Sequence, residues 1–262
     1  MGGNTTTGLA FGSVPATSVL PTGLARTTLD TLGQWIVNDR LPPSEVMPTE
    51  PELAASLGVS RTTVRDAVKV LSGKGLVRTA RRYGTRITPV SSWNLLDADV
   101  IAWHHPDHPR MRRIFAETTE LRSIVEPAAA ALAANRATSE QSDVILAAAQ
   151  AMYPELDVQA LFLADCRFHL TILEATQNQV MRQLQPIILT MLRISYEFGV
   201  RPENAPVTRE GHLRVAEAIA RRDAAGARAA MTRMLGRNES LAQDHPEPQP
   251  SCVTSSSKPP PD

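Results

Sequence analysis

Residues 49–75 contain the pattern that most restricts how this chain can fold. Thr49 can cap a helix that ends near Leu57, with acidic residues in its first turn, and Gly58 can form the turn that follows. Ser60 can cap a second helix, whose inward apolar stripe consists of Val64, Ala67, Val68 and Leu71. Two helices joined by a short glycine-containing turn are the pattern of a helix-turn-helix.

The polar residues of the second helix gather at its first turn. In a helix-turn-helix this is the end that reaches base edges in the DNA major groove. Arginine suits bidentate pairing with guanine, and threonine can contact a phosphate or a thymine methyl group. The sequence therefore predicts DNA contacts by Thr49, Ser60, Arg61, Thr62, Thr63 and Arg65.

The segment after Gly75 predicts a β-hairpin beside these helices. Two short strands would flank Tyr83-Gly84-Thr85, with arginines at positions 78, 81, 82 and 86. A glycine at the tip allows the backbone to approach the minor groove closely. We therefore add Arg82, Tyr83, Gly84 and Thr85 to the predicted contacts. The alternative is a set of solvated charges on an ordinary helical domain, and the hairpin favours DNA binding over it.

The charge of the chain is unevenly distributed. The chain has 262 residues, with 27 Lys+Arg and 27 Asp+Glu, so its formal net charge is zero. Residues 24–90 contain ten basic and six acidic residues, a net charge of +4, which leaves −4 for the rest of the chain. A neutral total therefore hides a basic N-terminal module, which is compatible with DNA binding.

The remainder of the chain has a helical pattern. Aromatic residues make up only 4% of the chain, and alanine and leucine, which favour helices, dominate its apolar residues. Helices are expected at about 110–134 (with a kink near Pro127), 138–152, 157–176, 178–200, 206–222 and 224–241. The predicted fold class is mainly α, with an N-terminal winged helix-turn-helix and a C-terminal all-helical bundle.

The predicted organisation has five parts. They are a disordered extension at 1–23, a winged helix-turn-helix domain at 24–90, a linker at 91–109, an all-helical effector-binding and dimerisation domain at 110–242, and a disordered tail at 243–262. The tryptophan-containing linker is expected to pack the two domains together. Its histidines at 104, 105 and 108 are interpreted as a solvated cluster in a loop rather than as metal ligands.

The histidine and aspartate residues of the helical part suggest a metal site. Asp165 and His169 are four residues apart, so they share one face of a helix and can bind the same ion. His212 lies on a later helix with its own apolar stripe. The alternative is a hydrogen-bonded core pair with a histidine near a helix end, and spacing alone leaves both possibilities open.

Composition excludes several classes of protein. No run of 18 apolar residues is present, which argues against a membrane span. Two cysteines cannot form a disulfide framework, and the N-terminus lacks the pattern of a secretory signal. We therefore expect a cytoplasmic protein without a membrane partner.

The string PTEPELAASLGVSRTTVRDAVKVLSGKGLV, followed by RRYGT, resembles the winged helix-turn-helix of the GntR family of bacterial transcription regulators. The resemblance implies that Arg61, Thr62, Thr63, Arg65 and Gly84 contact operator DNA. The chain departs from the family at Pro51, where a basic residue is usual. One phosphate contact is then missing, and Arg40 or the hairpin arginines are candidates to replace it.

The strings ELRSIVEPAAAALAANRAT, DCRFHLTILEATQN and EGHLRVAEAIARRDAAGARAAM resemble the FCD effector domain of the FadR subgroup. Many members bind a divalent metal, such as zinc, through one aspartate and three histidines, and the metal helps to hold a carboxylate effector. Asp165, His169 and His212 match three of these ligands, and residues 178–200 contain no histidine that matches the fourth. The linker string WNLLDADVIAWH is most similar to galactonate- and other sugar-acid-responsive members.

The same resemblance indicates residues for the effector. Arg122 matches a position that often faces the pocket, and the alternative for it is a salt bridge within the bundle. The candidate effector contacts are Arg122, Thr190, Arg193 and Tyr196.

The leading hypothesis is a homodimeric DNA-binding regulator, a repressor, whose operator affinity responds to a small carboxylate. It is not expected to be an enzyme. The alternative is a metal-dependent hydrolase that uses Asp165, His169 and His212, and no inward glutamate at a suitable spacing supports it. A third reading is a non-specific architectural DNA binder, which would leave the large helical domain without a purpose.

Overall fold

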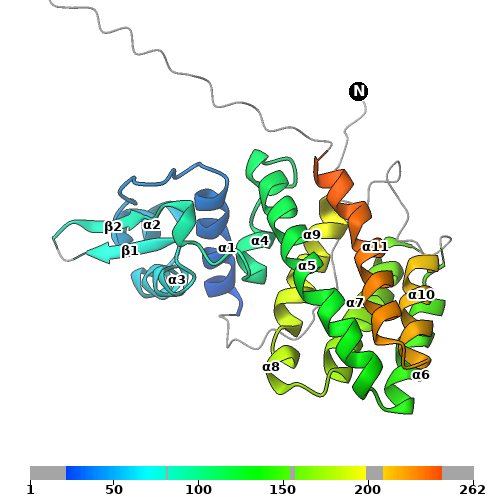
Figure 1. Ribbon diagram of the computed structural model, residues 1–262. Coiled ribbons are helices and arrows are strands. Elements are labelled where there is room, and N and C mark those ends of the chain that lie inside the picture. The colour runs from blue at the N-terminus through cyan, green and yellow to red at the C-terminus, as the bar shows by residue number, and fades with distance from the viewer. Residues whose placement is uncertain (1–21, 81, 154–156, 199–208, 244–262) are drawn as a thin grey trace, which may run out of the picture.

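The computed structural model describes residues 22–80, 82–153, 157–198 and 209–243. Nearly all of the two predicted disordered extensions, Arg81 and the first residues of the helix predicted at 206–222 lie outside these ranges. The predicted fold class is confirmed: a small lobe of three helices and a hairpin is followed by a larger, all-helical lobe (Figure 1). Among the described helices, none is both long and apolar enough to cross a bilayer.

The N-terminal lobe has the predicted helix-turn-helix. It consists of α1 (Leu24–Val37), α2 (Glu50–Leu57), α3 (Arg61–Gly73), β1 (Val77–Ala80) and β2 (Gly84–Ile87). A capping box between Thr49 and Glu52 begins α2, and Gly58 ends it in the left-handed conformation. Ser60 caps α3 by accepting a hydrogen bond from the Thr63 backbone N–H. The inward stripe of α3 is buried as predicted.

The hairpin differs in one detail from the sequence prediction. β1 and β2 pair antiparallel, with Val77 opposite Ile87 and Ala80 opposite Gly84. Gly84 is therefore the first residue of β2 and not the centre of the turn. Its φ of +76° and that of Arg82, +73°, supply the left-handed backbone that a tight turn requires.

The connector is ordered and packs on the N-terminal lobe. It contains a short 3-10 helix, η1 (Val90–Ser92), and α4 (Ala98–Ala102). Trp93 and Trp103 are buried in the core of that lobe. Lys74 Nζ, at the end of α3, lies 2.7 Å from Asp97 and 2.8 Å from Asp99.

The histidines of the connector do not form a solvated cluster. His104 is only 6% exposed, and its Nδ1 lies 2.7 Å from the backbone oxygen of Val100. His108 caps α5 and contacts Asp39, whereas His105 is exposed. All three histidines do lie in the segment between α4 and α5, but the prediction of a solvated cluster was wrong for His104, because its contact with Val100 of α4 holds the ring in the core.

The C-terminal lobe packs its helices around a long central one. Its elements are α5 (Pro109–Arg136), α6 (Ser139–Gln150), α7 (Val158–Ala175), α8 (Gln179–Arg182), α9 (Gln185–Phe198), α10 (Arg209–Ala220) and α11 (Ala224–Gln243). Helix α5 contacts α7, α9, α10 and α11. It runs through Pro127 as a single helix. The helix predicted at 178–200 is divided, because α8 ends before Pro186, which lies in the first turn of α9.

Candidate functional site

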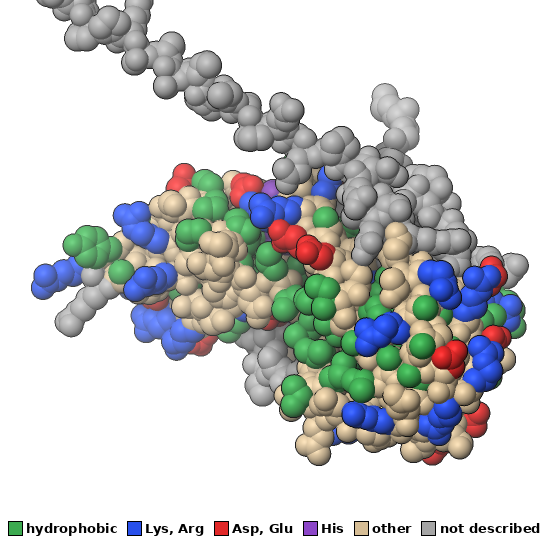
Figure 2. Space-filling model, in the orientation of Figure 1, with side chains coloured by type: hydrophobic (Ala, Val, Ile, Leu, Met, Phe, Trp, Pro, Cys, Tyr) green, Lys and Arg blue, Asp and Glu red, His purple; other side chains and the backbone are tan. Residues whose placement is uncertain are grey.

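Most of the predicted DNA contacts are exposed in the N-terminal lobe. Thr63 and Thr85 are partly buried, and the other eight are exposed: Thr49, Ser60, Arg61, Thr62, Arg65, Arg82, Tyr83 and Gly84. Figure 2 shows Lys and Arg side chains gathered at the end of this lobe that carries β1, β2 and α3.

Local bonds fix several of these side chains. The Thr49 hydroxyl donates to Glu52 at 2.7 Å, so it belongs to the cap of α2. The Arg65 guanidinium donates to Glu50 from Nε at 3.1 Å and from Nη2 at 2.9 Å. This exposed pair joins the start of α2 to the second turn of α3 and holds the guanidinium on the surface.

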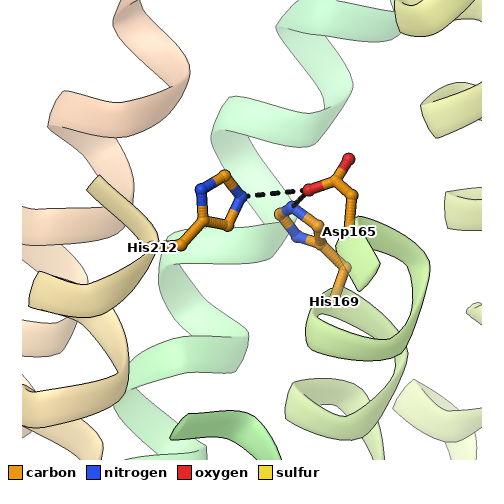
Figure 3. Close-up of side chains that lie close together, drawn as sticks. All are labelled: Asp165, His169 and His212. Atoms are coloured by element: carbon orange, nitrogen blue, oxygen red, sulfur yellow. Dashed lines mark hydrogen bonds and ion pairs between the residues drawn. The ribbon is translucent and has the colours of Figure 1, made fainter. Parts of the chain in front are cut away.

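The three predicted metal ligands converge in the C-terminal lobe (Figure 3). Asp165 and His169 come from α7, and His212 comes from α10. The Nε2 atoms of His169 and His212 lie 3.2 and 3.0 Å from Asp165 Oδ1. One ligand atom from each residue lies within 4.8 Å of the others, and all three side chains are buried.

Glu126 is the member of this site that the sequence analysis missed. It lies on α5, is 3% exposed, and its Oε2 is 2.7 Å from His169 Nδ1. This correction also bears on Arg122, whose Nε donates to Glu126 Oε1 at 2.5 Å and whose Nη1 donates to Ser195 at 3.0 Å. The four-residue spacing of Arg122 and Glu126 could have indicated their pairing, but not their contact with α7.

Opposite charges stabilise the ionised forms of these buried groups. Burial alone would raise the pKa of Asp165, but His169 and His212 lower it well below its usual range. In the same way, burial is outweighed at Glu126 by Arg122 and His169, which lower its pKa to about 2. Burial would lower the pKa of His169, yet Glu126 and Asp165 raise it to about 9.

The donor set fits a divalent metal of the zinc type. One carboxylate and two imidazoles are ligands that zinc accepts, and three protein ligands leave a position open. Helix α9 packs against α7 and carries Tyr196, whose hydroxyl is buried, senses the charge of Asp165 and has no hydrogen-bond partner among the described residues. An oxygen-containing ligand in the open position would give that hydroxyl an acceptor.

The other predicted effector residues differ in how free they are. Thr190 is buried, and its hydroxyl donates to the Pro186 carbonyl at 3.0 Å. Arg193 is partly buried on the same helix. Arg122 makes three hydrogen bonds with the described residues, one of them long at 3.5 Å, and a guanidinium has five N–H donors. The salt bridge that was the alternative for Arg122 is therefore present, and two of its five N–H groups make no hydrogen bond with the described residues.

Comparison with known proteins decides the family. The family described as bacterial regulatory proteins, gntR family, matches residues 24–87, and the FCD domain matches residues 117–237. The galactonate operon transcriptional repressor of Escherichia coli is 32% identical over 208 residues, which cover 78% of this chain and 90% of that protein. The chain belongs to the GntR family. It is a transcription regulator of the group that carries an FCD domain.

Two further proteins are similar to this chain, one in sequence and one in fold. The transcriptional repressor NanR of Citrobacter rodentium is 28% identical over 202 residues, covering 73% of this chain and 75% of that protein. The solved structure of Lar, which controls expression of the Listeria monocytogenes agr system, covers 85% of this chain and 98% of its own with a TM-score of 0.60. Its 21% identity shows a shared fold.

Proposed function

We propose that this GntR regulator is a repressor whose affinity for operator DNA is set by a small carboxylate, a sugar acid or a related organic acid, in the FCD domain. The observation that carries the proposal is the buried group of Asp165, His169 and His212, together with the buried Arg122 and a Tyr196 hydroxyl that has no hydrogen-bond partner among the described residues. The similarity to a galactonate operon repressor supports the choice of acid.

Each side chain has a distinct role in this proposal. Asp165, His169 and His212 hold a divalent metal, which supplies a positive centre for a carboxylate or hydroxyl oxygen. The spare N–H groups of Arg122 bind the carboxylate, since a buried guanidinium and a carboxylate form strong charge-assisted hydrogen bonds. Thr190, Arg193 and Tyr196 on α9 orient the rest of the acid.

A packed route joins this site to the DNA-binding lobe. Ile194 of α9 is fully buried against Ile101 of α4 and Phe115 of α5. Helix α4 is in turn tied to the end of α3 by the ion pairs of Lys74. A shift of α9 when the acid binds would therefore move α3, the helix expected to enter the major groove of the operator (the recognition helix). The acid lowers DNA affinity by the same factor by which DNA lowers affinity for the acid.

The protein would act as a homodimer, because two recognition helices are needed to read a two-fold symmetric operator. Leu121 and Ile124, which lie on α5, are 37% and 66% exposed. Figure 2 shows apolar side chains gathered on the helical lobe beside the junction of the two lobes. This surface is our candidate for the dimer contact, and light scattering should give twice the mass of one chain.

The hydrolase alternative is weaker, although an inward glutamate is present after all. Glu126 contacts the Nδ1 side of His169, away from the nitrogen that faces Asp165. It is also held by Arg122, and its low pKa of about 2 makes it a poor base at neutral pH. Its position therefore suits the orientation of the proposed metal ligand His169 rather than proton transfer to or from a water molecule.

A thermal-shift screen of sugar acids, with Zn²⁺ and with a chelator, tests the proposed site. The expected result is a rise in melting temperature with one class of acid that depends on Zn²⁺. His169→Ala should remove the response, while an equivalent change at the exposed His105 should keep it. A response that is the same in the chelated protein and in His169→Ala would contradict the metal part, and no response to any acid would contradict the effector part.

A further inference from the structure

Glu126 lies at the centre of a buried row of charged groups that joins α5 to α7. Its Oε1 accepts a short hydrogen bond from Arg122 Nε, and its Oε2 accepts a long one from Nη2 at 3.5 Å and lies 2.7 Å from His169 Nδ1. Both Arg122 and Glu126 are 3% exposed, so water does not compete for these contacts. Neither residue belongs to the group of three that can hold the metal.

The two ring nitrogens of His169 face different carboxylates. Nδ1 is 2.7 Å from Glu126, whereas Nε2 is 3.2 Å from Asp165, which His212 also contacts. A neutral imidazole carries one proton, so only one of its nitrogens can bind a metal. Nδ1 lies within 2.7 Å of Glu126 Oε2 but does not complete a hydrogen bond with the described residues. A rotation of the ring about its present position would let Nδ1–H donate to Glu126 and leave Nε2 for the ion.

We propose that Glu126 is a positioning residue that fixes the tautomer and orientation of His169, so that Nε2 serves as a metal ligand. The inference rests on the metal site of the proposed function. A carboxylate that accepts the second N–H of a metal-bound histidine orients the ring and makes it a stronger ligand.

Arg122 makes this arrangement possible in a buried site. An isolated buried carboxylate would become protonated or would destabilise the fold, and a protonated Glu126 could not accept two N–H groups as strongly. The bond from Arg122 Nε keeps Glu126 ionised while leaving Oε2 directed at His169. A single glutamate thereby connects the proposed metal to the proposed effector arginine.

Zn²⁺ affinity of Glu126→Gln, measured by competition with a chromophoric chelator, tests the proposal. Glu120→Gln is the matched control, because Glu120 is an exposed residue of the same helix. We expect Glu126→Gln to bind Zn²⁺ about 10- to 100-fold more weakly than the control. The visible spectrum of bound Co²⁺ should keep its form, because the three ligands are unchanged. Equal affinities in the two variants would overturn the proposal.

A measurement on the unaltered protein covers the case in which Glu126→Gln does not fold. In Zn²⁺-loaded protein with ¹⁵N-labelled histidine, long-range NMR correlations should show the proton of His169 on Nδ1. A proton on Nε2 would overturn the proposal. If the unaltered protein binds no Zn²⁺, both this inference and the proposed metal site fail, whereas normal binding with the other tautomer leaves the metal site intact.

Discussion

At the scale of single residues, the informative side chains are buried polar groups that the fold leaves without a partner. Among the described residues these are the Tyr196 hydroxyl, His104 Nε2 and His169 Nδ1, the last of which lies 2.7 Å from Glu126 without completing a hydrogen bond. A buried unpaired polar group costs about 1–3 kcal/mol, so its retention calls for a reason beyond packing. For Tyr196 we propose that the missing partner is the bound effector acid. For His104 we expect a fold that becomes less stable as the pH falls.

Tyr196→Phe should separate stability from ligand response. Removing an unpaired buried hydroxyl should leave the unfolding free energy unchanged or raise it by about 1 kcal/mol. The same change should weaken the response to the acid about 3- to 10-fold, because a ligand loses one hydrogen bond. Urea denaturation measures the change in stability. The response is measured by adding increasing amounts of the effector acid to the protein–DNA complex. Tyr153→Phe, at a half-exposed tyrosine, should change neither, and a stability loss in Tyr196→Phe would contradict the account.

His104 should make the fold less stable in mild acid. Burial lowers its pKa from 6.5 to about 4, with a further lowering from the nearby Arg110, and these effects outweigh the hydrogen bond to the Val100 carbonyl and the charge of Asp39, which raise it. Between these two values the unfolded chain binds more protons than the folded one, so stability falls as the pH falls.

The loss should reach about 2 kcal/mol by pH 5. His104→Asn, which can keep a donor toward Val100 but does not titrate, should reduce the loss between pH 7 and pH 5 by that amount. Denaturation curves at the two pH values measure it, and His105→Asn serves as the exposed control. The same pH dependence in all three proteins would exclude His104 as its source.

Arg65→Ala should test whether this arginine reads a base. If it pairs with guanine, the variant should lose about 1–3 kcal/mol of discrimination between operator and random DNA. Lys69→Ala, one turn further along α3, is the control. Fluorescence anisotropy with both DNAs measures the difference. A uniform loss on both DNAs would place Arg65 on a phosphate instead.

At the scale of elements, the contact of α1 with α4 joins the connector to the DNA-binding lobe. The Trp103 indole donates to Asp30 of α1 at 2.8 Å, and its ring lies against Gly33. A Cβ added at Gly33 would lie 2.4 Å from the Trp103 ring, which is closer than any real contact. The absence of a side chain at this position is therefore what lets α4 approach.

Gly33→Ala should destabilise the N-terminal lobe by about 1–3 kcal/mol, because the buried indole cannot move aside freely. Gly73→Ala is the matched control, since nothing lies within 4 Å of a Cβ at that helical position. It should leave stability unchanged or raise it by about 0.5–1 kcal/mol. Thermal unfolding compares the two. Equal stability would show that the ring of Trp103 is loosely held.

The elements that the sequence predicted well are those whose signals are local. The caps at Thr49 and Ser60 act on backbone groups within three residues of them, and the apolar stripe of α3 repeats every three to four residues. Both signals can be read directly from a short stretch of sequence. The division before Pro186 also has a local signal, because proline favours the first turn of a helix, and the sequence prediction did not use it. The burial of His104 depends on how the connector packs on the N-terminal lobe. Likewise, the spacing of Asp165 and His169 predicts a shared face of one helix, whereas the contact of Glu126 joins two helices and leaves no short-range pattern.

At the scale of the whole molecule, the charge asymmetry follows the division into lobes. The net charge of +4 on residues 24–90 accompanies the exposed arginines of α3 and the hairpin, and the excess of acidic residues lies in the rest of the chain. From so modest a positive charge we expect weak non-specific affinity, with specificity resting on Arg61, Thr62, Thr63 and Arg65.

The central claim is that occupancy of the helical lobe controls DNA binding by the other lobe. The most direct test is the affinity of the Zn²⁺-loaded protein for an operator selected from random DNA, measured by anisotropy while galactonate and related acids are added. We expect one class of acid to weaken operator binding about 5- to 150-fold, the usual range of coupling between two sites. If an acid binds the protein and the operator affinity still does not change, the proposed control of DNA binding is contradicted.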